Sequence, residues 1–122
     1  MTVRNYTELI AWQEAMALAE TAYRLTARFP PREIYGLSRQ VRNAAVSVPS
    51  NIAEGQGRRS TKELLHHLSI AHGSLRELET QILLSGKLGY LAPHEVDGLM
   101  ASSAEVGRLI NGLANSLMPN RR

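Results

Sequence analysis

The chain has 122 residues, a formal net charge of +3 and no cysteine, which is the size of one domain with one core. The lack of cysteine excludes disulfides and thiolate metal sites and is typical of a reducing compartment. No stretch has the apolar length of a signal peptide or a membrane span, so we expect a soluble, cytoplasmic protein with no membrane partner.

Apolar residues recur at steps of three and four in four segments, which is the period of an α-helix. The first segment predicts a helix over about 8–28, with Thr7 as its N-cap. Phe29-Pro30-Pro31 ends it, because a residue before proline is pushed out of the helical region. The expected core stripe is Leu9, Trp12, Met16, Ala19 and Tyr23, widened by Leu18, Ala22 and Leu25.

The second segment predicts a helix over about 32–55, and its apolar spacing passes through Pro49. A proline inside a helix costs about 3 kcal/mol if nothing compensates, so two short helices are the alternative. Because the apolar phase is the same on both sides, we predict one helix kinked at Pro49, with Ser47 and Ser50 satisfying freed backbone groups. The apolar positions are Ile34, Leu37, Val41, Ala45, Val48 and Ile52.

Helix-start signals define the last two segments. Ser60 and Glu63 form a capping box, which starts a third helix at about 61–87, and Pro93 starts a fourth at about 93–117. Gly73-Ser74 in the middle of the third helix predicts that another backbone approaches closely there. Because the connections are short, consecutive helices should fold back on each other. The prediction is an all-α, antiparallel up-down-up-down four-helix bundle, as a single domain over 1–122.

The polar residues do not form the pattern of a known metal or catalytic site. Di-iron bundles need Glu-x-x-His on two helices, but only Glu63 and His66 make such a pair, and zinc on Glu63, His66 and His67 would lack a fourth ligand. No serine lies in a nucleophile elbow, and the glycine-rich turn at 55–58 follows a helix and lacks the Lys-Ser/Thr of a P-loop. We expect no metal, no cofactor and no enzymatic activity.

Positive charge is concentrated between Arg24 and Lys62, where eight Arg or Lys face two acidic residues. Such an asymmetry attracts phosphate-rich partners. The alternative is purely structural: Gly55 and Gly57 end one helix, Ser60 caps the next, and Arg58 and Arg59 are solvated. The candidate nucleic-acid-binding residues are Arg39, Arg42, Arg58, Arg59 and Lys62.

Several polar residues lie close to the predicted core stripes. Buried amides and carboxylates need partners, so we expect an inter-helix network, completed by Arg39 or Arg42, that fixes the helix register. Its expected members are Gln40, Asn51, Glu54, Glu77 and Gln81.

Two motifs carry a family resemblance. The segment 38–58, SRQVRNAAVSVPSNIAEGQGR, closely resembles the signature of the four-helix bundle proteins encoded in intervening sequences of bacterial 23S ribosomal RNA genes. The segment 71–81, AHGSLRELETQ, resembles the second signature of that family. The resemblance implies a left-handed bundle that forms a ring-like homopentamer, similar to the accessory protein of diversity-generating retroelements, with no enzymatic activity.

The chain departs from the family pattern at Asn43 and His72, where arginine is usual, and at 64–67, which lacks the usual aromatic residues. Each change weakens a surface that RNA would contact. From the basic residues that remain, we predict a non-enzymatic homo-oligomer in which they contact RNA or DNA phosphates without reading sequence. The alternative is a protein-interaction scaffold or accessory subunit, in which the basic residues form ion pairs between subunits.

Overall fold

The computed structural model describes residues 5–118, and every regular element in that range is helical. The all-α class with four helices is thus confirmed for the described part of the chain. Two short 3-10 turns precede the first two helices. The elements are η1 (Tyr6–Glu8), α1 (Ile10–Thr26), η2 (Pro31–Glu33), α2 (Leu37–Gln56), α3 (Thr61–Lys87) and α4 (Pro93–Ser116).

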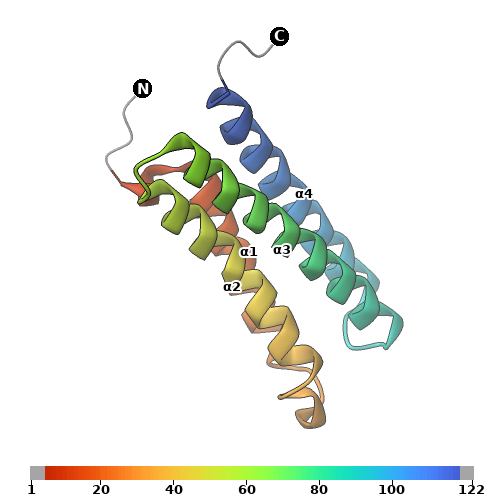
Figure 1. Cartoon of the computed structure of the whole chain (residues 1–122). Coiled ribbons are helices and arrows are strands. Elements are labelled where there is room, and N and C mark those ends of the chain that lie inside the picture. The colour runs from red at the N-terminus through yellow and green to blue at the C-terminus, as the bar shows by residue number, and fades with distance from the viewer. Residues whose placement is uncertain (1–4, 119–122) are drawn as a thin grey trace.

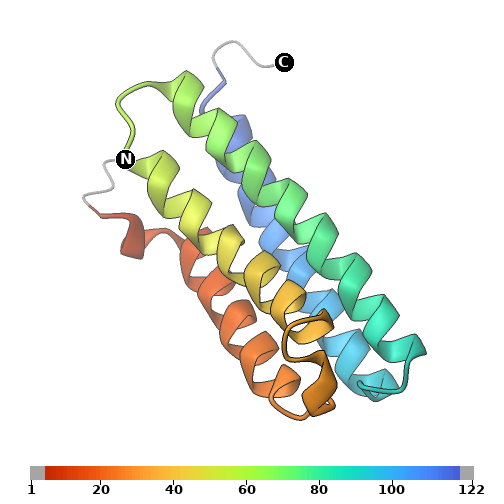
Figure 2. The same ribbon diagram turned by 60° about the horizontal axis from the view of Figure 1, so that its bottom comes forward.

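Helices that are neighbours along the chain are also neighbours in space. α2 packs against α1 and α3, α4 packs against α3 and α1, and within the described residues the diagonal pairs do not meet. The α1–α2 and α3–α4 connections lie together at one end of the molecule, and the α2–α3 connection lies at the other (Figures 1 and 2). We call these the two-turn end (27–36 and 88–92) and the one-turn end (57–60).

The start of α1 differs from the prediction. Thr7 does not cap it, because Thr7 lies inside η1, where its own N–H donates to Asn5 Oδ1 (2.9 Å). Leu9, in an extended conformation, precedes the first helical residue. The chain therefore enters α1 through a separate turn, and α1 is shorter at both ends than the predicted 8–28.

α2 begins five residues later than expected and then runs without interruption. Pro31–Glu33 forms η2, and Gly36 precedes the first residue of α2. The helix continues through Pro49 to Gln56, so the alternative of two short helices is wrong. The Ser47 hydroxyl bonds to a neighbouring helix instead of serving the backbone around Pro49.

Side-chain caps fix the starts of α3 and α4. Ser60 Oγ accepts the N–H of Glu63 (3.1 Å) one turn into α3. Glu95 Oε1 accepts the N–H of Ala92 (2.9 Å), and Pro93 is the first residue of α4. In the connection between α3 and α4, Gly89 has φ +80°, a left-handed conformation that favours glycine. The chain reverses direction there.

The buried apolar residues of α1 are mostly alanines, whereas those of the other helices are mostly larger aliphatic residues. Trp12 is half-buried, and Met16 and Tyr23 are each 45 % exposed, so three residues of the predicted α1 stripe lie outside the core. The buried apolar residues of the helices are Ala11, Ala15, Leu18, Ala19 and Ala22 in α1, Leu37, Val41, Ala44, Ala45, Val48 and Ile52 in α2, Leu68, Ala71, Leu75, Leu78 and Ile82 in α3, and Leu99, Val106 and Ile110 in α4.

Candidate interaction surfaces

The candidate nucleic-acid-binding residues form two groups, at opposite ends of α2. Arg39 and Arg42 lie in its first two turns, whereas Arg58, Arg59 and Lys62 lie at the one-turn end. At 1.5 Å per helical residue, roughly 25–30 Å separates the groups. The structure therefore does not bring the five residues together into one patch.

Two of these cations already have partners. Arg42 Nε donates to Thr26 Oγ1 (2.8 Å), and the guanidinium lies 4.7 Å from the centre of the Tyr23 ring. Arg58 forms an ion pair with Glu54 (2.7 Å). Arg42 thus ties α2 to α1, and a ligand would have to compete for Arg58.

The other three cations are exposed. Arg39, Arg59 and Lys62 form no ion pair with any residue of the described range. Arg59 and Lys62 flank the Ser60 cap at the start of α3, where backbone N–H groups and the helix dipole also favour an anion. This end is the better placed of the two for phosphate contact.

The expected polar network is replaced by a different one between α2 and α3. Ser47 Oγ and Ser74 Oγ are 2.8 Å apart, Asn51 Nδ2 donates to Ser47 Oγ (3.1 Å), and Asn51 Oδ1 lies 3.1 Å from His67 Nδ1. Only Asn51 was among the predicted members. Sequence reasoning missed His67 as a partner because nothing local shows which residue of α3 faces Asn51.

The remaining predicted network members do not meet one another. Gln40, Glu54 and Glu77 are exposed, and Glu54 bonds to Arg58 instead. Gln81 is buried in α3, and its Oε1 has no hydrogen-bond partner. With no partner for its Oε1, Gln81 does not make the register-fixing contact that we expected.

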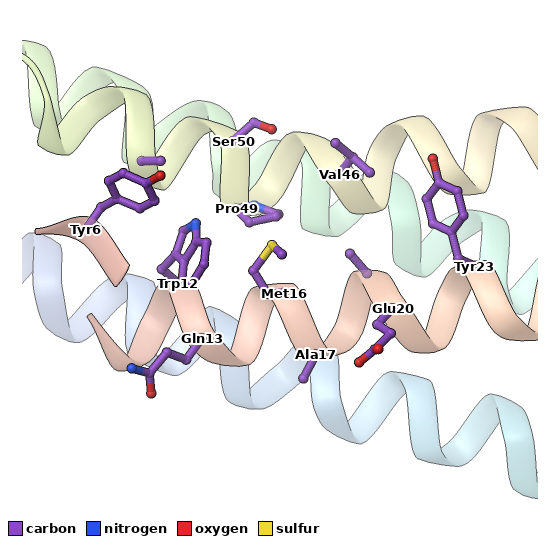
Figure 3. A pocket seen from close by; sticks show the side chains of 12 residues that line it. Tyr6, Trp12, Gln13, Met16, Ala17, Glu20, Tyr23, Val46, Pro49 and Ser50 are labelled. Carbon is purple, nitrogen blue, oxygen red and sulfur yellow. The ribbon is translucent and has the colours of Figure 1, made fainter. Parts of the chain in front are cut away.

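A groove with an apolar lining runs between α1 and α2, with a volume of about 730 Å³. Trp12, Met16 and Tyr23 project from α1 toward Val46 and Pro49 of α2 (Figure 3). The centres of the Tyr6 and Trp12 rings lie 5.3 Å apart, and the ring planes are inclined at 71°. These side chains are the part of the predicted α1 stripe that the core does not use. We call this surface the aromatic groove: Tyr6, Trp12, Met16, Tyr23, Val46 and Pro49.

A second apolar surface lies on the α3–α4 side, and it forms a smaller depression of about 400 Å³. Val96 of α4 contacts α3 so closely that a Cβ on Gly86 would lie 2.8 Å from Val96 Cγ2. The pair α1 and α2 forms one side of the bundle, and the pair α3 and α4 forms the opposite side. This surface therefore faces away from the aromatic groove. We call it the leucine face: Leu83, Leu91, Pro93 and Val96. Leu84, near the end of α3, and Leu88, just after it, are also exposed.

A third surface is the turn before α2, where Glu33 makes two hydrogen bonds. Its Oε1 accepts the N–H of Leu37 (3.0 Å), and its Oε2 accepts the hydroxyl of Tyr90 (2.8 Å). The Leu37 N–H, followed by the Tyr90 hydroxyl, lowers the pKa of the Glu33 carboxyl. Ionised Glu33 therefore links η2 and α2 to the α3–α4 connection.

Neither a metal cluster nor a membrane-spanning helix occurs in residues 5–118. No group of three or more His, Asp or Glu residues there is arranged to hold a metal. None of the four helices is long and apolar enough to cross a bilayer.

The chain has known relatives in structure and in sequence family. A crystal structure of a protein with unknown function from the S23 ribosomal protein family of Bacteroides thetaiotaomicron superposes with a TM-score of 0.80 at 18 % identity, over 86 % of this chain and 98 % of that one. No curated protein matches significantly. The family model of the 23S rRNA-intervening sequence protein matches residues 7–112. This protein therefore belongs to the 23S rRNA-intervening sequence protein family.

Proposed function

We propose that the protein is a non-enzymatic, cytoplasmic building block of a homo-oligomer, and that the aromatic groove is its assembly surface. The observation that carries the proposal is the exposure of Met16 and Tyr23, together with a half-buried Trp12, in one continuous groove. Aromatic residues and methionine are enriched at interfaces. A contiguous apolar surface of this kind marks an interaction site.

A second copy of the chain is the proposed occupant, through its leucine face. The two surfaces differ and face away from each other, so a contact between them is head-to-tail, and such contacts form rings when the rotation closes. Five subunits is the number that the family resemblance implies. The left-handed, antiparallel up-down-up-down bundle is likewise part of this proposal.

Trp12 provides a direct test, because it is the only tryptophan in the chain and lines the groove. Dilution should shift its fluorescence maximum to longer wavelength as subunits separate, in parallel with a fall in mass by light scattering. Met16→Lys should give a monomer of 13.5 kDa with unchanged helicity. The matched control is Ala104→Lys, which places the same charge on the exposed face of α4 and should leave the oligomer intact. A wild type that is monomeric at ~100 µM would overturn the proposal.

Nucleic-acid binding is a second candidate function, favoured by the exposed and unpaired Arg59 and Lys62 beside the start of α3. These cations would neutralise phosphates without reading bases. Fluorescence anisotropy of labelled RNA and duplex DNA, titrated at several salt concentrations, should give micromolar binding that weakens steeply with salt. Arg59→Ala/Lys62→Ala should weaken binding and reduce the salt slope by about two.

The control for this titration is Arg76→Ala/Arg108→Ala, which removes the same charge from cations engaged in ion pairs with Glu79 and Glu105. This variant should keep the wild-type salt slope. No binding by the wild type at ~50 mM salt would exclude the nucleic-acid function and leave the assembly function standing alone.

A further inference from the structure

The turn between η2 and α2 presents two apolar side chains to solvent. Tyr35 is 83 % exposed and Ile34 is 56 % exposed. No other large apolar residue of the described range is as exposed as Tyr35. The turn lies at the two-turn end of the bundle (Figure 2), well away from Arg59 and Lys62.

Hydrogen bonds fix the backbone of this turn, although the side chains of Ile34 and Tyr35 are exposed. The N–H groups of Glu33, Ile34 and Gly36 donate to the carbonyls of Pro30, Pro31 and Glu33 at 2.9–3.1 Å. The Glu33 carboxylate adds bonds to Leu37 and Tyr90. The Tyr35 ring therefore projects from a fixed backbone, so little backbone entropy is lost when a ligand packs on it.

The stretch of chain around Tyr35 is rich in arginine. From Arg24 to Arg42 the chain carries five arginines and a single acidic residue, Glu33. Arg32 and Arg39 lie three residues before and four after Tyr35, are exposed, and form no ion pair in the described part of the chain. Arg28, two residues after the end of α1, is already paired with Glu95. The surface fits an anionic partner that also has a flat apolar face.

We propose that Tyr35 is a stacking platform for an unpaired nucleotide base and that Arg32 and Arg39 bind the phosphates on either side of it. Single strands are bound by aromatic rings that stack on bases together with cations that follow the backbone. A base inside a duplex hides both faces, so the site selects single strands. The proposal rests on the nucleic-acid function above and adds to it a second site, at the opposite end of the bundle from Arg59 and Lys62, that takes single strands.

A lipid surface fits this turn less well. Helices that lie in a membrane interface bury a long apolar face, whereas here only Ile34 and Tyr35 project. Here one exposed aromatic ring is accompanied by two exposed arginines in the same stretch of chain, Arg32 and Arg39, and a ring with cations beside it in the chain is the combination that single strands require. Single-stranded nucleic acid is therefore the partner that the charges and the ring favour together.

The test is anisotropy with a labelled, unstructured 12-nucleotide single strand and a duplex of the same length. Tyr35→Ala should weaken single-strand binding about 5- to 100-fold, with duplex binding and salt slope unchanged. Tyr35→Phe, which keeps the ring, should bind like the wild type. Arg32→Ala/Arg39→Ala should lower the salt slope for the single strand.

Ile34→Ala is the matched control, because it removes an exposed side chain from the same turn without removing a ring, and it should change affinity less than twofold. Equal single-strand binding by wild type and Tyr35→Ala would overturn this inference while leaving the nucleic-acid function in place. A wild type that binds neither the single strand nor the duplex would overturn both this inference and the nucleic-acid function. A Tyr35→Ala variant that loses binding only to anionic phosphatidylglycerol vesicles would assign the turn to lipid and also overturn the inference.

Discussion

Single polar residues hold α2 and α3 in register. Ser47, Asn51, Ser74 and His67 form a chain of contacts at 2.8–3.1 Å across the interface. Ser74 is buried, so its hydroxyl needs a partner inside the protein. The serine and asparagine of the family motif in α2 therefore have a structural role in this chain.

Removing the Ser74 hydroxyl should destabilise the fold by about 0.5–1.5 kcal/mol, because Ser47 then loses one hydrogen-bond partner in a half-buried position. Urea unfolding followed by circular dichroism should show the lower midpoint in Ser74→Ala. Ser69→Ala removes a hydroxyl from an exposed position on the same helix and should leave the midpoint unchanged. Equal midpoints for the two variants would show that the Ser47–Ser74 bond contributes nothing measurable.

At the scale of helices, the close approach of α2 and α3 occurs at Gly55, near the one-turn end. A Cβ on Gly55 would lie 2.8 Å from His67 Cβ and 3.0 Å from Leu64 Cδ1. Of the pair Gly73-Ser74, for which a close approach was predicted, Gly73 has nothing within 4 Å of a Cβ built there, whereas Ser74 contacts Ser47 of α2 at 2.8 Å. Both glycines lie within helices, so they differ only in which atoms of neighbouring helices surround them.

These two glycines give opposite predictions for the same substitution. Gly73→Ala should stabilise the protein by about 0.5–1 kcal/mol, because alanine loses less backbone entropy in a helix. Gly55→Ala should destabilise it by about 1–3 kcal/mol, because the new methyl group forces α2 and α3 apart. Thermal unfolding should therefore rank Gly73→Ala above wild type and Gly55→Ala below it; the reverse order would contradict the helix packing described.

At the scale of the whole molecule, carboxylates connect the two helix pairs at the two-turn end. Glu33 joins the turn before α2 to Tyr90 in the α3–α4 connection, and Glu95 of α4 pairs with Arg28 just beyond α1. The Ala92 N–H, followed by the Arg28 side chain, lowers the pKa of Glu95. Both carboxyls therefore favour the folded state when they are ionised.

The pH dependence of stability follows from the direction of these shifts. A carboxyl whose folded pKa lies below its unfolded value near 4.5 stabilises the fold above that pH and loses the effect as pH falls through the folded pKa. Glu33→Gln should therefore be less stable than wild type at pH 7, and the difference should shrink below about pH 4.5. Urea midpoints measured from pH 3 to 7 decide this, and a constant difference would mean that ionisation of Glu33 plays no part.

Local signals in the sequence determined much of this protein. The four-helix count, the capping box at Ser60, the start at Pro93 and the stop at Phe29-Pro30-Pro31 all depend on residues close together in the chain. Such signals act through backbone geometry and neighbouring hydrogen bonds, so they are readable without tertiary structure. The family motifs, which lie within single helices, were equally readable.

Only the tertiary structure decided which faces of the helices lie inside. One face of α1 carries alanines, and the neighbouring face carries Trp12, Met16 and Tyr23. Both sets of residues have helical spacing. Packing selected the alanines, because small side chains let α1 lie close to its neighbours, and this left the aromatic groove exposed. The separation of Arg39 from Arg59 and the pairing of Asn51 with His67 were decided in the same way, since contacts between helices depend on register that no local pattern contains.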